Sequence, residues 1–208
     1  PILPMLASSA PTIANAWERL GGQVADRDAD AGADEGPRRI AVDTKLDGIR
    51  VQVHRDGDEV TIASRSLDDL TARLSDLADV VRTFPAERFI LDGEALALDA
   101  TGRPHAFQDT AARTASQGAS DDALRLTPFF FDVLHVDGHD LLDEPAYRRF
   151  DALESLVPEP YRVRRLVTDE LAEAERFGAR VLADGHEGVV VKDIKAPYAA
   201  GRRGAAWV

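Results

Sequence analysis

The sequence predicts an α+β fold, and three observations lead to this prediction. Runs with strand periodicity are joined as hairpins, most clearly by Asp56-Gly57, and they alternate irregularly with helical runs. The sequence lacks the steady strand–helix–strand repeat that would favour a parallel, doubly wound sheet. It also lacks the G-x-x-x-x-G-K and G-x-G-x-x-G patterns, which excludes the two common glycine-rich phosphate loops.

Composition narrows the class of protein further. A length of 208 residues can bury a large core, as one domain or as two small ones. There is no cysteine, and no apolar run approaches the length of a membrane span, so we expect a soluble, cytoplasmic protein without membrane contact. The net charge of −12 argues against a self-sufficient nucleic-acid binder, because phosphate contacts need a basic surface.

The first third of the chain predicts one helix and a set of strands. A short helix should begin near Ser9 or Thr12 and bury Ile13, Ala16, Trp17 and Leu20. Residues 21–37 are rich in glycine, aspartate and alanine and predict a mobile acidic loop. Strands are then expected at residues 39–42, 49–53 and 60–63.

The middle of the chain predicts a helix and two long strands. Ser66, with Asp69 three residues later, predicts the start of a helix. Its buried stripe would comprise Leu67, Leu70, Leu74, Leu77 and Val81. Strands are expected at residues 89–98 and 126–136, with a short helix at 107–113 and a flexible loop at 114–122 between them. The second of these strands contains Phe129, Phe130 and Phe131, and at least one of the three should lie in the core.

The last third of the chain predicts two helices and two strands. Helices are expected at residues 146–156 and 170–183, the second with Leu171, Ala174, Phe177 and Val181 facing inward. Strands are expected at residues 163–167 and 187–192. A loop at 196–205 should lead into a further strand that begins at Ala206-Trp207-Val208.

Lys45 is the candidate nucleophile. It belongs to the pattern K-x-D-G-x-R, formed by Lys45, Asp47, Gly48 and Arg50, and it lies where one predicted strand turns into the next. A lysine amine attacks only after it loses a proton, which burial or neighbouring cations promote. Only 3 of the 25 cationic residues are lysines, which hints that an amine is needed here. The alternative is that Lys45 is a surface residue at a strand end and that Asp47-Gly48 is a plain turn.

Other polar residues could complete a nucleotide site around Lys45. Such a site needs hard oxygen ligands for Mg²⁺, a cation for the α-phosphate, an acceptor for the ribose hydroxyls and an aromatic ring for the base. The predicted strands carry Glu94, Glu187, Lys192 and the phenylalanines. The alternative for Glu94 is a surface charge on an edge strand, and for Glu187 and Lys192 it is a solvated strand end.

Taken together and in order, these segments resemble the ATP-dependent DNA ligases within the covalent nucleotidyltransferases. The matching segments are Leu3-Pro-Met-Leu-Ala7 (the lead-in), Lys45 to Arg50 (motif I), Ser64-Arg65, Leu91-Asp-Gly-Glu94 (motif III), Phe107-Gln108 with Arg113, Phe131-Asp-Val-Leu134 (motif IIIa), Glu187 to Lys192 (motif IV) and Gly201-Arg-Arg203 with Trp207. The resemblance covers nearly the whole chain. It implies a fold similar to ATP-grasp proteins, with mainly antiparallel sheets flanked by helices and a nucleotide cleft between them.

The resemblance also implies a role for each matching residue. Lys45 would form lysyl-AMP, with Asp47 beside it in the catalytic motif. Asp43 or the backbone at Thr44 would read the adenine edge, Phe131 would stack on adenine, and Arg50 and Glu94 would contact the ribose. Glu187 would help to hold Mg²⁺, Lys192 would contact the α-phosphate, and Arg203 is a weaker candidate for the nucleotide pocket. Arg65 would meet the 5′-phosphate of nicked duplex DNA.

The resemblance has a boundary and leaves alternatives open. Family members continue past the tryptophan with two motif V lysines, so residues 1–208 are expected to be an adenylation domain that stops just before motif V. The oligonucleotide-binding-fold domain and any N-terminal DNA-binding domain would lie outside it, and residues 1–208 alone should seal nicks poorly. We expect a monomer that acts in DNA repair, replication or recombination. An RNA ligase or an mRNA-capping nucleotidyltransferase is the first alternative, and a non-catalytic scaffold of the same fold is the second.

Overall fold

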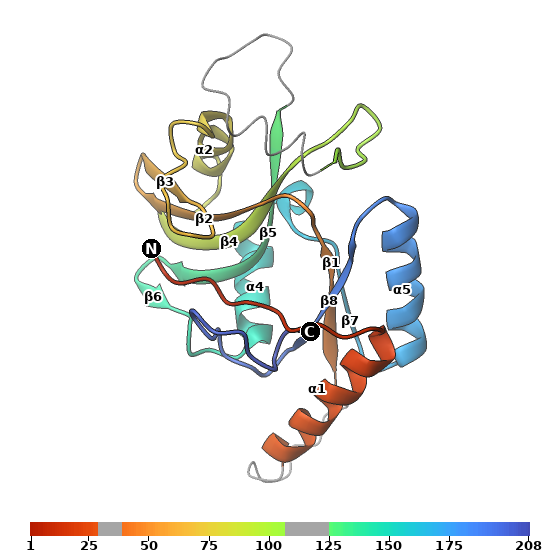
Figure 1. Cartoon of the computed structure of the whole chain (residues 1–208). Helices are drawn as coiled ribbons and strands as arrows, with labels where there is room; N and C mark the ends of the chain where they lie inside the picture. The colour runs from red at the N-terminus through yellow and green to blue at the C-terminus, as the bar shows by residue number, and fades with distance from the viewer. Residues whose placement is uncertain (29–38, 107–124) are drawn as a thin grey trace.

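The computed structural model describes residues 1–28, 39–106 and 125–208, and in this part of the chain it contains two antiparallel sheets (Figure 1). The five-stranded sheet has the order β3-β2-β4-β5-β6, and the three-stranded sheet has the order β7-β1-β8. The strands of the larger sheet are β2 (Ile49–Asp56), β3 (Glu59–Ala63), β4 (Arg88–Ala97), β5 (Leu126–Val136) and β6 (His139–Asp140). Those of the smaller sheet are β1 (Ile40–Lys45), β7 (Arg165–Thr168) and β8 (Gly188–Asp193).

Helices flank both sheets, as predicted for this fold class. Among the described residues they are α1 (Ile13–Asp28), α2 (Ser75–Arg82), α4 (Ala146–Leu156) and α5 (Leu171–Ala183), with a 3₁₀ turn at η1 (Glu159–Tyr161). The start of α1 lies against α5, and both helices pack on the three-stranded sheet, while α4 lies between the two sheets (Figure 1). Because each helix has one apolar side, it buries that side against a sheet.

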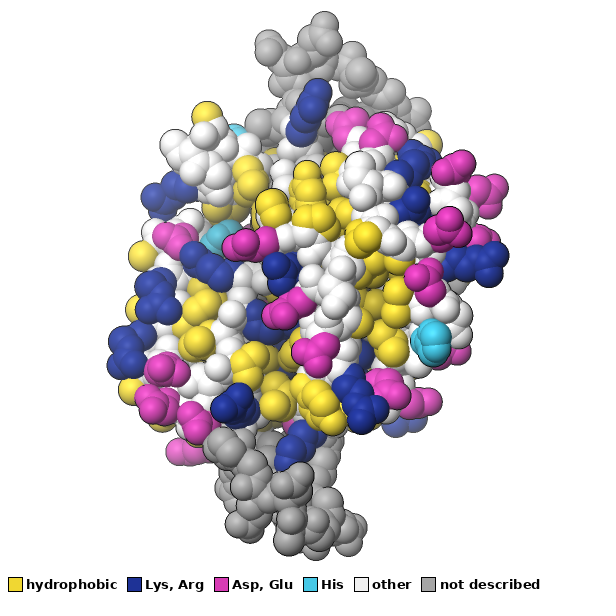
Figure 2. All heavy atoms as spheres, turned by 180° about the vertical axis from the view of Figure 1, so that it is seen from behind, with side chains coloured by type: hydrophobic (Ala, Val, Ile, Leu, Met, Phe, Trp, Pro, Cys, Tyr) yellow, Lys and Arg dark blue, Asp and Glu magenta, His cyan; other side chains and the backbone are white. Residues whose placement is uncertain are grey.

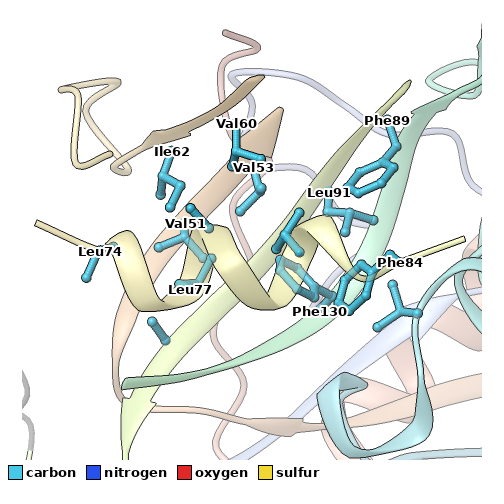
Figure 3. Close-up of a cluster of buried hydrophobic side chains, with 14 of the residues drawn as sticks. Val51, Val53, Val60, Ile62, Leu74, Leu77, Phe84, Phe89, Leu91 and Phe130 are labelled. Atoms are coloured by element: carbon cyan, nitrogen blue, oxygen red, sulfur yellow. The ribbon is translucent and has the colours of Figure 1, made fainter. Parts of the chain in front are cut away.

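The largest core cluster lies between α2 and the five-stranded sheet (Figure 3). Leu74 and Leu77 meet Val51, Val53, Val60 and Ile62 of the sheet, and Phe84, Phe89 and Phe130 close the other end. A second cluster joins α1 and α5 to β1 and β8 through Leu20, Val42, Phe177, Val181 and Val191. Helix α4 connects the two sheets, since Leu153 and Leu156 belong to the first cluster while Phe150 packs with Ala41 of β1.

Two predictions about helices are wrong in part. Helix α1 begins after Thr12, whose Oγ1 accepts a hydrogen bond from the Asn15 amide, but it continues to Asp28. The predicted acidic loop is therefore helical over residues 21–28, and residues 29–37 lie outside the described part of the chain. The segment at Ser66 is not helical, because Leu70 pairs back onto Ile62 and the hydroxyl of Thr71 binds the Ile62 amide. Short polar side chains that bind the nearby backbone compete with a helix in this way.

The remaining elements follow the prediction closely. Helix α4 has the predicted bounds, the Asp56-Gly57 hairpin forms with Gly57 at φ +61°, and β7 begins two residues later than expected. The sequence predicts that a strand begins at Ala206, and the structure has an isolated bridge between Trp207 and Lys192 there. The backbones of Val191 and Val208 exchange two hydrogen bonds, so these last residues pair with the edge of β8. The helix and loop expected at 107–122 lie outside the described residues.

A bulge in β5 lies within the run of three phenylalanines. Asp92 of β4 pairs with Asp132, whereas Gly93 pairs with Phe130, so Phe131 is an extra residue without a partner on β4. Phe130 is fully buried, while Phe129 and Phe131 are half-buried, as alternation predicts. A Cβ on Gly93 would lie 2.7 Å from the Phe130 ring and from the Phe129 carbonyl oxygen. Glycine at this position therefore allows β4 to approach the bulge.

Candidate active site

A cleft of about 1140 Å³ opens between the two sheets, and both sheets contribute to its walls. The site residues predicted from the sequence all line it: Asp43, Thr44, Lys45, Asp47, Arg50, Arg65, Glu94, Phe131, Glu187, Lys192 and Arg203. These residues are spread over most of the chain, so the fold has gathered them into one site. The lead-in and the start of α1 form a further part of the wall.

Lys45 ends β1 and faces Glu187, the residue just before β8. Because Lys45 pairs with Gly188 in the antiparallel register, the Glu187 side chain reaches the amine directly. The Lys45 Nζ lies 2.8 Å from Glu187 Oε1, and the two side chains are 48% and 45% exposed. The candidate nucleophile is therefore accessible from the cleft and is not buried in the core.

The turn after Lys45 lies tightly against β4. A Cβ on Gly48 would lie 2.2 Å from the carbonyl oxygen of Ala95, so glycine is required at this position. The Gly48 amide donates a hydrogen bond of 3.2 Å to Glu94 Oε1. Burial raises the pKa of Glu94 to about 7, although Arg50 and the Gly48 amide act in the opposite direction. Glu94 can thus be present in both protonation states near neutral pH.

Arg50 is held in place by several groups. Its guanidinium forms two hydrogen bonds of 2.7 Å to the Asp92 carboxylate and a third to the Met5 carbonyl oxygen. Tyr198 donates to the same carboxylate and accepts from the Met5 amide. The guanidinium carbon also lies 5.0 Å from the centre of the Phe131 ring. The lead-in segment therefore helps to fix the Arg50 side chain at the floor of the cleft.

Lys192 lines the cleft and lies among aromatic rings. Its Nζ is 4.6 Å from the centre of the Phe131 ring and 4.1 Å from that of Trp207, and it is 2.8 Å from Asp43 Oδ2. Burial lowers the pKa of Lys192, and Asp43 partly counteracts this effect. A phosphate group entering the cleft would compete with Asp43 for this ammonium group.

Asp43 is buried, and both of its carboxylate oxygens have hydrogen-bond partners. Arg165 donates to both carboxylate oxygens, and Lys192 binds Oδ2 as well. Burial alone would raise the pKa of Asp43, but Arg165 and Lys192 together lower it below its usual value. The amide of Thr44 donates to the Arg164 carbonyl oxygen. The role of Asp43 or Thr44 at the adenine edge stays a prediction.

The three remaining predicted residues lie at the rim of the cleft. Asp47 and Arg65 are exposed in turns that follow β1 and β3. Arg203 donates to the Ala7 carbonyl oxygen and forms a bridge to Leu6, so it fastens the lead-in. An Arg203 role in the nucleotide pocket also stays a prediction.

Sequence reasoning missed Arg165, Asp92 and Tyr198. A signal for Arg165 was present, because Arg164 and Arg165 are adjacent in the strand predicted at 163–167 and neighbours in a strand point to opposite faces. Arg164 is half exposed and pairs with Asp184, whereas Arg165 points inward. No comparable local signal marks Tyr198, since its partners Met5 and Asp92 are distant in the sequence.

The carboxylates at the cleft fit a Mg²⁺ site of the kind that shares its ligands with a nucleotide. Among the described residues, no group of three or more histidine, cysteine, aspartate or glutamate side chains could hold a metal alone. Glu187 and Asp47 nonetheless supply hard oxygen donors at the exposed side of the cleft. Mg²⁺ often binds through one or two carboxylates together with substrate phosphates and water.

Comparisons with known proteins show the family to which the chain is similar. Residues 4–208 match the family described as ATP dependent DNA ligase domain. The chain is 57% identical over 208 residues to a probable DNA ligase of a Nocardioides species and 55% identical to one of Kineococcus radiotolerans. All of this chain, but only 37% of each relative, is covered, so the chain spans just over a third of their length.

Solved structures match over the whole fold. A mycobacterial DNA ligase D complexed with ATP and MES is 28% identical, with a TM-score of 0.71 over all of this chain and 59% of the other. A Chlorella virus DNA ligase-adenylate is 18% identical, with a TM-score of 0.64 over 98% of this chain and 64% of the other, which supports the fold alone. In the described part of the chain, no helix is both long and apolar enough to cross a membrane.

Proposed function

This chain belongs to the family of ATP-dependent DNA ligase domains, and from that premise we propose that it is an adenylation domain with Lys45 as its nucleophile. The observation that carries the proposal is the pairing of an accessible Lys45 amine with Glu187 in the cleft that also contains Lys192 and Phe131. The whole protein would then be an ATP-dependent DNA ligase that joins nicks during DNA repair, replication or recombination.

The first step is nucleotidyl transfer to the protein. After losing a proton, Lys45 Nζ attacks the α-phosphorus of ATP, a nitrogen–phosphorus bond forms, and pyrophosphate leaves with the electrons of the broken phosphorus–oxygen bond. The product is lysyl-AMP. Because Lys45 ends a paired strand, the sheet positions the amine before the nucleotide arrives.

The surrounding residues bind and orient the nucleotide in this proposal. Phe131 stacks on the adenine ring, Glu94 and Arg50 face the ribose, and the Lys192 ammonium group moves from Asp43 to the α-phosphate. Glu187, with Asp47 nearby, would hold Mg²⁺ through its carboxylate. When bound, the metal neutralises the negative charge that develops on the phosphate oxygens.

Two further transfers complete the proposed reaction. The 5′-phosphate of a nick attacks the phosphorus of lysyl-AMP and releases Lys45, and the 3′-hydroxyl then attacks the activated 5′-phosphate and releases AMP. Arg65 at the rim is the proposed contact to the 5′-phosphate. Basic and acidic side chains are interspersed over the face shown in Figure 2, and the net charge is −12. Most of the phosphate contacts to DNA should therefore be made by parts of the protein outside these residues. We expect the protein to act as a monomer.

Label transfer tests this proposal. The full-length protein is incubated with Mg²⁺ and ATP labelled at the α-phosphate, and then given a nicked duplex. The protein should become labelled as pyrophosphate is released, and the label should then leave as AMP while the nick closes. A protein that never becomes labelled would refute the proposal. Labelling with GTP in preference to ATP would favour the capping-type alternative.

A further inference from the structure

Arg165 is a partly buried arginine that contacts residues of the cleft but does not itself line the cleft. It lies on β7, and only 11% of its side chain is exposed. Its guanidinium binds both oxygens of Asp43, and its Nη2 also donates a hydrogen bond of 2.8 Å to the Phe131 carbonyl oxygen. The Phe150 ring of α4 covers the guanidinium at 3.5 Å. Because its planar guanidinium has partners on three sides, the Arg165 side chain is held in one position.

These contacts tie the two sheets together at the floor of the cleft. Asp43 lies on β1, two residues before Lys45, whereas Phe131 is the bulged residue of β5 in the other sheet. One side chain therefore fixes both the strand that carries the proposed nucleophile and the residue proposed to stack on the base. A lysine at position 165 would keep the charge but could not make this set of bonds.

The charges around Asp43 do not cancel. One carboxylate lies between the two cations Arg165 and Lys192, which leaves one excess positive charge in a buried place. The next carboxylate, Asp132, is already paired with the buried Arg149. Without Arg165, Lys192 would be the only cation that the described part of the chain places at Asp43, and the two would form a neutral pair. A neutral pair would resist the transfer of Lys192 from Asp43 to a phosphate.

We propose that Arg165 is a positioning residue for the adenylation step. It neutralises Asp43, so that Lys192 is available to the α-phosphate. It also fixes the position of the Phe131 backbone relative to β1, the strand that ends at Lys45. The proposal rests on the proposed function above. Arg165 touches no substrate atom in this scheme. It acts through Asp43, Lys192 and the Phe131 backbone.

The first test separates this role from a purely structural one. Arg165→Met and Arg165→Lys are made in the full-length protein, and Arg164→Met is the matched control, because the neighbouring Arg164 is half exposed and points away from the cleft. For each variant we would measure thermal unfolding, the dissociation constant for ATP and the rate of label transfer at saturating ATP. Arg165→Met should slow transfer about tenfold or more while ATP binding weakens less, because an interaction realised mainly in the transition state is lost.

Arg165→Lys should lie between the wild type and Arg165→Met, since it keeps the charge and loses the fork. A structural role alone would lower the fraction of protein that becomes labelled and leave the rate constant of the folded fraction unchanged. If Arg165→Met does not fold at the assay temperature, Arg165→Lys decides: a rate several-fold below the control supports the proposal, and a rate equal to the control overturns it.

The second test restores the charge. Arg165→Met removes the excess positive charge, and adding Asp43→Asn restores it, since Lys192 is then the only charge of the three that remains. The double variant should transfer AMP several-fold faster than Arg165→Met. A double variant as slow as Arg165→Met, or slower, would overturn the proposed neutralisation. If neither the wild type nor Arg164→Met becomes labelled, the proposed function is refuted as well. If both controls become labelled and every Arg165 variant transfers AMP at the same rate as they do, this inference alone is refuted.

Discussion

The Nζ of Lys45 lies 2.8 Å from Oε1 of Glu187, and both side chains are about half exposed at the cleft. The pair is set by strand register, because Lys45 is opposite Gly188, the residue after Glu187. Ion pairs with this degree of exposure contribute roughly 0–1 kcal/mol to stability. The contact therefore orients the amine, and a bound nucleotide can separate the two groups at little cost.

Lys45→Arg should abolish AMP transfer in the full-length protein. A guanidinium stays protonated near neutral pH and cannot attack phosphorus, although it keeps the charge beside Glu187. Label transfer from ATP labelled at the α-phosphate measures the effect, and ATP binding serves as the control for an intact site. A labelled protein band in the variant would remove Lys45 from the role of nucleophile.

Glu187→Ala should reduce nucleotidyl transfer far more than it reduces ATP binding. The carboxylate is needed most when charge develops on the phosphate oxygens. Glu175→Ala is the matched control, because Glu175 is an exposed carboxylate of α5 that lines the same cleft away from Lys45. Equal losses of binding and transfer in Glu187→Ala would instead indicate that the carboxylate is structural.

Phe131→Ala should weaken ATP binding by a stacking-sized amount, on the order of 1 kcal/mol or somewhat more. Phe129→Ala is the control, because Phe129 is also half-buried on β5 but does not line the cleft. Equilibrium binding of ATP gives the two values. An unchanged affinity in Phe131→Ala, or a larger loss in Phe129→Ala, would contradict the stacking role.

Glu94 should make stability depend on pH. Its pKa is about 7 in the folded protein and 4.5 ordinarily, so the folded protein holds this proton more tightly than the unfolded chain does. The stability that the group contributes is therefore fully present below about pH 4.5 and is lost as the pH rises through about 7. The side chain of Glu94→Gln cannot ionise. The melting temperature of this variant should therefore rise relative to that of the wild type as the pH increases through this window. A difference that stays constant with pH would contradict the raised pKa.

Gly48→Ala should lower both stability and AMP transfer. The new Cβ would lie 2.2 Å from the Ala95 carbonyl oxygen, so the turn must move away from β4, and the Glu94 contact to the Gly48 amide must lengthen. A cost of roughly 1–3 kcal/mol is typical of overpacking. Gly204→Ala is the control, because a Cβ there meets nothing within 4 Å. Thermal unfolding of the two variants compares the effects, and an equal, small change in both would show that the turn can relax.

Much of the fold was predictable because its signals are local. Alternating strands around the Asp56-Gly57 turn, and helices such as α4, bury one face each, and that face is visible as a period in the sequence. The segment after β3 was mispredicted for a physical reason. Its Ser66 pattern is typical of a helix start, but pairing of Leu70 with Ile62 competed successfully with helix formation.

The sequence by itself determined which residues are the candidates for the chemistry. It placed Lys45 at a strand end, and the motif order selected Glu94, Phe131, Glu187 and Lys192, all of which the structure brings to one cleft. A motif can be recognised in this way because its residues are close together along the chain.

Only the tertiary structure decided which of these groups meet. Lys45 and Glu187 are 142 residues apart, and Asp43 and Arg165 are 122 apart. Periodicity states which face a side chain occupies, but the partner on that face depends on strand register and on how the two sheets pack. For this reason, the hydrogen bonds from Arg165 to Asp43 and to the Phe131 carbonyl oxygen became visible only once β1, β5 and β7 were placed in space.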